Sequence, residues 1–477
     1  MMKAKHAFCS GLYGLMAMGL LLLASCADHY DGDESWSPQV KNSTLQSPEA
    51  KGIQVVSSPD GSTMTISWPV VYGAGGYSVA LYNVNDPSTP VLVKSDTIDG
   101  CSLTAPREED TNYSFSVKAL GNTKYNNKEA QATTELAFTT FLPTYAEIPD
   151  GSDLKEWFAA NPVPQDSTSH LCYDLVPGGN YTVSGNINFG GHQVTLRSSS
   201  KATNANVKML ASSTFTTFAG FTLKYLNIDA DELNHSLISY SDEPDDSIKN
   251  LIGTANYYII MDPVVVQGCN ITRLGTSIIA TNSTKYNLRT MSISNCVVEF
   301  NKESTGHNSA DFVYMKSGYI TDFTLKNSTV YSPVHISNYF ITHGGRPKDL
   351  GDGEQRHVSI VSCTLANLTY GGNFCNYHNG QTYYYYTLRN TIVQDCGKPN
   401  FLTGLNKGQS SDNPVWDVNN NTCWRDGADA SASQTGIKNP GLWLTTDPGI
   451  DPANAQFTPA AAQQEAGQGD PRWNTNN

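Results

Sequence analysis

An eight-residue pattern of apolar and polar positions recurs along the second half of this 477-residue chain. In each copy the first, third and eighth positions are apolar. The fifth is small or an amide and the sixth is small or a thiol, except in the first copy, which has Tyr225 and Leu226 there. The alternation has a period of two residues, which is typical of a strand with one buried face. The copies span residues 221–228, 264–271, 291–298, 323–330, 358–365, 386–393 and 416–423.

The spacing of the copies predicts how these strands stack. Successive copies lie about thirty residues apart, the range in which each unit of a solenoid buries its apolar face against its neighbours. A strand, a turn and a second strand in every coil predict a right-handed, single-stranded parallel β-helix. We expect the third position of each copy to form one interior row, consisting of Leu223, Val266, Ile293, Leu325, Ile360, Leu388 and Val418.

The fifth and sixth positions predict the character of the turn. Asparagine recurs at the fifth position, and we expect a buried ladder in which each amide bonds the same amide on the next coil. Cysteine at the sixth position alternates with Ser328 and Thr391, which indicates small buried residues and no metal site. Whether Cys269 bridges Cys296 on the neighbouring coil stays open. The asparagines are Asn295, Asn327, Asn390 and Asn420.

Both ends of the coil stack need covering, because an open β-helix end exposes unpaired edges. Asp153 to Glu156 offers a helix start, with Leu154, Trp157 and Phe158 on one apolar side. We expect this helix to cap the first coil. At the other end, Trp443 and Trp473 are expected to act as plugs.

A separate module precedes the solenoid. Short strands are expected at 63–68, 76–82, 111–119 and 136–138, between turn signals. The module resembles a fibronectin type III domain, with Trp68 at the core tryptophan position and Tyr113 at the tyrosine corner. By fold-level analogy we expect it to act as a spacer. The predicted order is signal peptide (1–25), acidic linker (26–45), fibronectin type III-like domain (46–142), linker and capping helix (143–168), β-helix (169–445) and tail (446–477).

The N-terminus carries the features of an exported protein. Lys3, Lys5 and His6 precede an apolar stretch at 12–24, which is typical of a secretory signal and too short to span a bilayer. Leu23-Ala-Ser-Cys26 resembles the bacterial lipobox, which implies lipidation at Cys26 and durable membrane anchoring. The acidic residues that follow resemble the surface-export signals of Bacteroidetes lipoproteins. The resemblance implies an outer-membrane, lipid-anchored and surface-exposed protein.

Composition and charge narrow the classes of partner. Only 16% of residues are charged, while the chain has 25 Tyr and 39 Gly, a polar profile rich in strand formers. The net charge of −14 argues against nucleic acid as a partner, because the field of the protein would repel it.

The order of lipobox, type III module, coils and the closing Gly469-Asp-Pro-Arg-Trp473 resembles a group of Bacteroidetes β-helix lipoproteins of unknown function. The resemblance covers residues 26–473, and the closing pentapeptide is its most specific motif. Such proteins look like relatives of pectate lyases and chondroitinase B in fold. The resemblance implies polysaccharide capture at the outer membrane, with glycan transport components as partners, and it transfers no catalytic residues.

A lyase would need a base beside a neutralised uronic carboxylate. The candidate bases are Lys316, Arg346 and Arg356, and we expect the last two to lie in a Gly-rich loop that projects from the sheet edge. Calcium, possible only in a lyase, would need several convergent carboxylates. The one dense acidic run, 242–246, is expected to be a solvated loop, so we predict neither metal nor cofactor. The carboxylates that a glycosidase would need are scattered over separate coils, at Asp311, Asp322 and Asp417.

A binding face follows from the strand alternation, because residues between the inward positions point outward. Tyr383, Tyr385 and Arg389 are expected to share one outward row, with His357 on the preceding coil and Lys326 on the coil before that. Aromatic rings flanked by cations suit an acidic, pectin-like polysaccharide, although tyrosine is also frequent on exposed strands. A polysaccharide-binding lipoprotein is the favoured interpretation. A polysaccharide lyase is the first alternative, and a non-catalytic adhesin or structural surface protein is the second.

Overall fold

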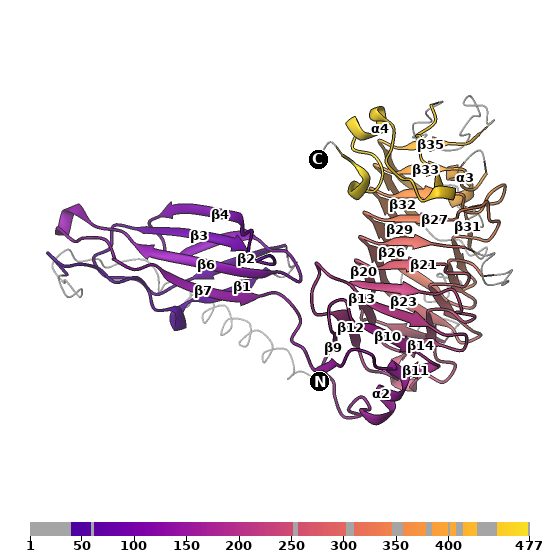
Figure 1. Ribbon diagram of the computed structural model, residues 1–477, viewed down its shortest axis with the longest axis horizontal. Helices are drawn as coiled ribbons and strands as arrows, with labels where there is room; N and C mark the ends of the chain where they lie inside the picture. Colours follow the sequence, from indigo (N-terminus) through magenta and orange to yellow (C-terminus); the bar gives the residue numbers. More distant parts are fainter. Residues whose placement is uncertain are drawn as a thin grey trace, which may run out of the picture. The chain divides into compact units, whose positions relative to one another are not determined.

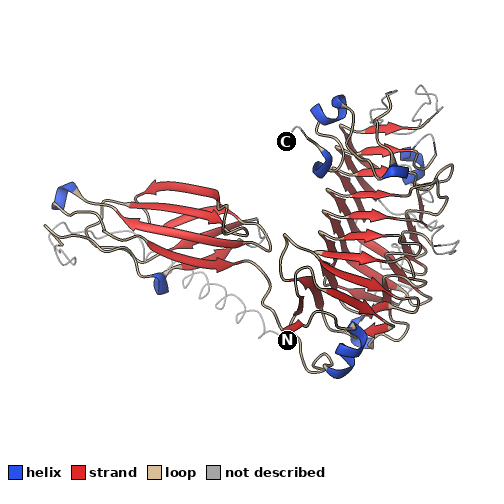
Figure 2. Ribbon diagram, in the orientation of Figure 1, coloured by secondary structure: helices blue, strands red, loops and turns tan. Residues whose placement is uncertain are grey.

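The computed structural model describes residues 40–58, 62–250, 256–301, 310–345, 356–377, 384–398, 401–406, 414–426 and 446–475. The chain divides into two compact units, Met1–Phe141 and Leu142–Asn477. Both are built almost wholly of strands (Figure 2), which confirms the predicted all-β class. In the described ranges no helix is long and apolar enough to cross a membrane.

The first unit is a sandwich of two antiparallel sheets (Figure 1). One sheet has the order β1-β2-β5 and the other β4-β3-β6-β7. The expected strands are present within one or two residues of their predicted ends. Their bounds are β1 (Gln54–Ser57), β2 (Thr63–Ser67), β3 (Tyr77–Asn83), β4 (Val91–Ile98), β5 (Ser102–Pro106), β6 (Asn112–Ala119) and β7 (Thr134–Thr139).

Two aromatic residues hold this sandwich together in the predicted way. Trp68 is 5% exposed, and its ring centroid lies 5.6 Å from those of Tyr77 and Phe115. The hydroxyl of Tyr113 accepts a hydrogen bond of 2.9 Å from the backbone N–H of Glu108. This side-chain bond across the corner between β5 and β6 is the tyrosine corner that the sequence predicted.

The second unit is a parallel β-helix whose coils form three sheets (Figure 1). Sheet I follows the path β34-β32-β29-β26-β23-β20-β15-β12-β9-β8, with β18 (Lys249–Asn250) and β19 (Tyr257–Ile260) beside it. Its strands are β8 (Ala146–Ile148), β9 (Leu171–Leu175), β12 (Val194–Ser198), β15 (Phe221–Lys224), β20 (Val264–Gln267), β23 (Tyr286–Ser294), β26 (Tyr319–Lys326), β29 (Arg356–Val361), β32 (Tyr384–Arg389) and β34 (Val415–Asn419).

Sheets II and III complete each coil. Sheet II consists of β10 (Asn180–Val183), β13 (Ala205–Met209), β16 (Leu226–Asp229), β21 (Asn270–Thr272), β24 (Val297–Glu299), β27 (Thr329–Tyr331), β30 (Thr364–Ala366), β33 (Ile392–Gln394) and β35 (Thr422–Trp424). Sheet III consists of β11 (Asn186–Asn188), β14 (Thr214–Thr217), β17 (Ile238–Tyr240), β22 (Ile279–Thr281), β25 (Val313–Met315), β28 (Ile341–His343) and β31 (Cys375–Tyr377).

The predicted interior row is confirmed residue by residue. The seven third-position residues, from Leu223 to Val418, pair in unbroken register across sheet I. Leu196 and Tyr173 extend the same row into the first coils. The row is fully buried except for Val418, which is half-buried on the last described strand of the sheet. This continuous apolar row is the core of the helix.

The predicted buried asparagine ladder is wrong. Asn295 is exposed and the other three asparagines are half-buried. All four have positive φ, between +48° and +54°, a left-handed conformation that asparagine and glycine adopt most readily. Backbone geometry therefore selects the residue at this turn. Of these four asparagines, only Asn420 donates to the amide of the next one in the row, at 2.8 Å to Asn390 Oδ1.

The sixth-position residues are buried, as predicted, and the structure shows why several residue types serve there. Cys296 Sγ and Cys363 Sγ each bond the carbonyl two residues back, at 3.1 Å, and a carbonyl of the preceding coil, at 3.4 Å. Thr391 Oγ1 makes the same two bonds, at 2.9 and 3.5 Å. Any short side chain with a donor satisfies this position. All cysteines in the described part of the chain are free.

The expected helix caps the first coil. It is α2 (Leu154–Ala160), and Asp153 caps it by accepting a hydrogen bond from the Glu156 N–H at 3.1 Å. Phe158 lies edge-on to Tyr173 and Phe189, with ring centroids 4.9 and 5.1 Å away. Figure 1 shows α2 at the end of the stack opposite β35.

The C-terminal tail does not plug the other end of the stack. Its described part, which includes α4 (Ala461–Glu465), packs along the outer face of sheet II. The rings of Phe457 and Tyr331 pack edge to face, with centroids 4.6 Å apart. The ring of Trp473 packs against Phe457, with centroids 5.6 Å apart. Trp473 is thus a lateral contact, and Trp443 lies outside the described residues. The short helix α3 (Phe401–Leu405) buries its apolar side chains against the last coils.

Candidate functional site

The predicted outward rows are present on sheet I. Asp322, His357, Tyr385 and Val415 pair in register on successive strands. A second row lies four residues further along the same strands. It consists of Lys326, Val361, Arg389 and Asn419, which also pair in register. The structure therefore brings together Tyr385, His357, Arg389 and Lys326 as expected, while Tyr383 lies outside the described residues.

The first row contains a pair of rings. The His357 and Tyr385 ring centroids are 5.1 Å apart with 38° between the ring planes. His357 is exposed and Tyr385 half-buried, so both present ring surface to solvent. His357 Nδ1 also lies 3.6 Å from Asp322 Oδ1, so a protonated imidazole would have a carboxylate partner on the coil before it.

The second row carries the cations, but one of them is already paired. Arg389 Nε lies 2.8 Å from Asp417 Oδ1, and a terminal guanidinium nitrogen lies 2.8 Å from Asp417 Oδ2. Such a bidentate pair fixes the guanidinium plane and offsets its charge. Lys326 is exposed one strand beyond Val361 and supplies the remaining cation of the row.

Small hydroxyl side chains fill the space between the two rows. Ser292, Thr324, Ser359 and Thr387 pair in register on four successive strands, and all are half-buried. Strands in a sheet are about 4.8 Å apart. The outer face of sheet I therefore offers a repeating row of hydroxyl donors and acceptors, bordered by rings on one side and long charged side chains on the other.

Arg356, a predicted base, does not project from the sheet edge. It is the first residue of β29, is 0% exposed, and its guanidinium lies over the Tyr319 ring at 5.0 Å. One guanidinium nitrogen donates to the Tyr319 hydroxyl at 3.3 Å. A side chain enclosed in this way cannot reach a polymer on the surface. Lys316 is exposed between β25 and β26, and Arg346 lies outside the described residues.

The scattered carboxylates serve structural roles. Asp311 is buried, its Oδ1 accepts from the Tyr339 N–H at 3.0 Å, and its Oδ2 accepts from Thr342 Oγ1 at 2.6 Å. Burial raises the pKa of Asp311. Asp322 and Asp417 face His357 and Arg389 on the surface. Across the described ranges no three His, Cys, Asp or Glu side chains converge in a way that could hold a metal ion.

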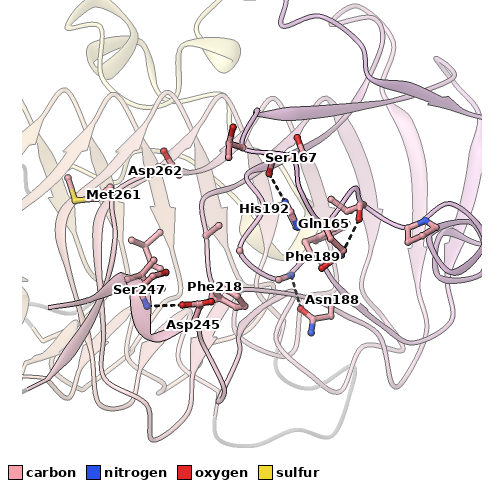
Figure 3. A pocket seen from close by; sticks show the side chains of 18 of the residues that line it. Gln165, Ser167, Asn188, Phe189, His192, Phe218, Asp245, Ser247, Met261 and Asp262 are labelled. Carbon is pink, nitrogen blue, oxygen red and sulfur yellow. Dashed lines mark hydrogen bonds between the residues drawn. The ribbon is translucent and has the colours of Figure 1, made fainter.

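The structure also contains a cavity of about 820 Å³ that the sequence did not reveal. Four segments far apart in the chain line it: 158–168 from the end of α2 onward, 187–192 from β11 onward, 218–219 after β14, and two stretches, 245–248 and 259–262, of the connection between β17 and β20. Figure 3 shows its side chains, which include Phe189, Phe218, Asn188, His192 and the carboxylates of Asp245 and Asp262. Its size is within the range of small-ligand pockets.

Local backbone geometry builds the floor of this cavity. Gly190 has φ +62°, and its N–H donates to Asn188 Oδ1 at 2.9 Å. A Cβ at Gly191 would lie 2.7 Å from the Phe218 ring, so only glycine lets this ring lie against the backbone. His192 Nδ1 lies 3.2 Å from the Ser167 carbonyl oxygen, which fixes the imidazole at the wall (Figure 3).

The cavity escaped sequence analysis because none of its residues belongs to the repeat. Asp245 lies in the acidic run that was expected to be a solvated loop, and its carboxylate caps a short turn by accepting from the Ser247 N–H at 2.7 Å. The paired glycines at 190–191 were the available signal. A glycine pair directly after a strand indicates a tight turn and says nothing about which distant segments meet there.

Comparisons with known proteins match two parts of the chain to family models of unknown function. Residues 2–176 match the family model DUF4992, a domain of unknown function, and residues 179–333 match DUF4957, another domain of unknown function. No curated protein matches the chain. A solved structure titled "Structure of FN3tt mut" is 23% identical over 21% of this chain and 100% of that chain, with a TM-score of 0.16.

Proposed function

We propose that this chain is a surface-anchored polysaccharide-binding lipoprotein of a glycan-utilisation system. In this proposal the outer face of sheet I is the binding surface, Cys26 carries the lipid anchor, and the partners are outer-membrane glycan transport components. The observation that carries the proposal is the accessible ring pair of His357 and Tyr385, 5.1 Å apart on adjacent coils.

The chemistry of the face supports this choice. Aromatic rings present an apolar surface with defined geometry, onto which the C–H face of a sugar ring can pack. The row from Ser292 to Thr387 adds a hydroxyl on each of four successive coils. Hydroxyl groups both donate and accept hydrogen bonds, as sugar hydroxyls do. A polymer lying across the strands would meet one of these hydroxyl groups on each of the four coils.

An acidic, pectin-like polysaccharide is the proposed ligand. The net charge of −14 repels a polyanion at long range, so attraction must come from cations within about 8–10 Å of the bound chain. Lys326 is such a cation. Asp417 offsets the charge of Arg389, so we propose that stacking and hydrogen bonding contribute more than charge.

The test is to incubate the purified protein with a panel of acidic and neutral plant and host polysaccharides. Binding is measured by affinity electrophoresis, and lyase activity by the absorbance of unsaturated products. We expect retardation by at least one acidic polysaccharide with no rise in absorbance. No retardation by any member of the panel would contradict the proposed function, and steady release of unsaturated oligosaccharide would replace it with the lyase alternative.

A further inference from the structure

We infer that the cavity between α2 and the β17–β20 connection is a second carbohydrate site, one that accepts a single neutral pyranose and excludes uronic acids. Its choice of ligand class rests on the proposed function, but its location and selectivity rest on separate residues. The cavity is lined by segments of the first coils, whereas Tyr385 and Arg389 lie on β32 near the other end of the stack.

The apolar part of the cavity presents ring and thioether surface. Phe218 is half-buried, with its ring against Gly191, and it borders the cavity together with Phe189. Met261 lies at the rim and is 70% exposed. An unbranched apolar side chain left this accessible beside a cavity is suited to contact a ligand that enters it.

The polar part combines two carboxylates with amide and hydroxyl side chains, among them Gln165 and Thr168. Asp245 and Asp262 present carboxylates, which only accept, and the Asn188 amide can both donate and accept. Asp245 and Asp262 are exposed at the cavity edge. A ligand that matches this lining must donate several hydrogen bonds around an apolar face. A pyranose has this combination, with C–H groups on its faces and hydroxyl donors on its edge.

Charge decides between neutral and acidic sugars. Hydrogen bonds from the N–H and the side chain of Ser247 lower the pKa of Asp245, which favours the ionised carboxylate. None of the described residues that line this cavity is a lysine or an arginine, so none carries a permanent positive charge. A uronate would therefore place a third negative charge next to two carboxylates, which is unfavourable. The cavity thus has the opposite preference to the one proposed for the face of sheet I.

Saturation-transfer NMR on the full-length protein tests the inference. The probes are the methyl glycosides of glucose, galactose and mannose, with galacturonate as the acidic comparison. We expect transfer to at least one neutral glycoside and at least tenfold less transfer to galacturonate. Phe218→Ala should abolish the neutral signal, while Tyr385→Ala should leave it unchanged because Tyr385 lies on β32, near the other end of the stack.

Two further measurements keep the outcome interpretable. The far-ultraviolet spectrum and unfolding midpoint of Phe218→Ala establish that the coils are intact. Asp262→Asn, a surface change that removes one charge without altering side-chain size, should raise transfer to galacturonate at least threefold, whereas Asp322→Asn on sheet I should not. Equal transfer to neutral and acidic sugars in the wild type, or an unchanged signal in a folded Phe218→Ala variant, would overturn the inference. Loss of polysaccharide retardation in Tyr385→Ala alone would leave it standing, so the two proposals fail separately.

Discussion

The carboxylate of Asp470 accepts a hydrogen bond of 2.9 Å from the hydroxyl of Thr329, which lies 141 residues earlier in the chain. Trp473 Nε1 donates to the same hydroxyl at 2.7 Å, and the Asp470 N–H donates to Thr364 Oγ1 at 3.0 Å. Gly469 has φ +88°, and a Cβ there would lie 3.0 Å from Ile392 Cδ1. The closing pentapeptide therefore holds the tail against sheet II, which gives Gly469, Asp470 and Trp473 a structural role.

Asp470→Ala is expected to lower the free energy of unfolding by about 1–3 kcal/mol, because it leaves buried donors on the tail and on sheet II without their acceptor. Chemical denaturation monitored by circular dichroism measures the change. Glu465→Ala, an exposed change in the same tail, should stay within about 0.5 kcal/mol of the wild type. Equal losses in both variants would contradict this structural role of Asp470.

Replacements of Asn327 separate backbone geometry from amide bonding at the turn. Its φ of +48° is unfavourable for alanine by about 1–2 kcal/mol, whereas glycine adopts it freely. We expect Asn327→Ala to be destabilised by about 1 kcal/mol relative to Asn327→Gly in thermal unfolding. Similar losses in the two variants would restore the hydrogen-bonding interpretation of the asparagine ladder.

Acid should destabilise the β-helix through His343. Burial, aided by the nearby charge of Arg356, lowers the pKa of His343 from 6.5 to about 3. Between these two values the unfolded chain binds a proton that the folded chain does not. Stability therefore falls as the pH is lowered through this window, by up to about 1.4 kcal/mol per pH unit.

His343→Asn removes the titrating ring while keeping a polar side chain of smaller size. Urea unfolding between pH 7 and pH 4 should then show a shallower loss of stability than in the wild type, whatever the absolute stability of the variant. An unchanged slope would mean that other groups dominate acid unfolding in this range.

Tyr385→Ala should weaken polysaccharide binding several-fold, since it removes the ring that packs against His357 on the binding face. Affinity electrophoresis on a retained polysaccharide measures the effect, and added salt should weaken binding further if the ligand is a uronan. Tyr314→Ala is the matched control, because Tyr314 is also half-buried and faces outward, but on sheet III. Full affinity in Tyr385→Ala would move the site elsewhere.

Cys26→Ala tests the anchor. The lipobox interpretation requires acylation at this cysteine, so the variant should leave the membrane fraction and lose incorporation of labelled fatty acid. Cys101→Ala, which changes a half-buried thiol of the sandwich, should leave both properties intact. Continued membrane association of Cys26→Ala would contradict lipid anchoring at this residue.

The sequence by itself determined the architecture and the register of sheet I. Because the side-chain period of a strand is two, a shift of one residue would expose the whole apolar row, so Leu325 and its equivalents could occupy only one position. Capping chemistry placed α2 in the same way, through Asp153, and local packing rules placed Trp68 and Tyr113 in the sandwich. Each of these inferences depends on neighbours in the chain or on a strict repeat.

Tertiary structure decided the positions and contacts of residues outside the repeat. The polar residues next to Arg356 in the sequence predicted a cation in an exposed loop. In the structure its side chain is buried against the Tyr319 ring. The same holds for the pairing of Arg389 with Asp417 and for the docking of Trp473 on Thr329. The cavity at Phe218 forms where four distant segments meet. Periodicity sets which face a strand residue takes, but contacts between segments without a repeat depend on the path of the whole chain, which no local pattern encodes.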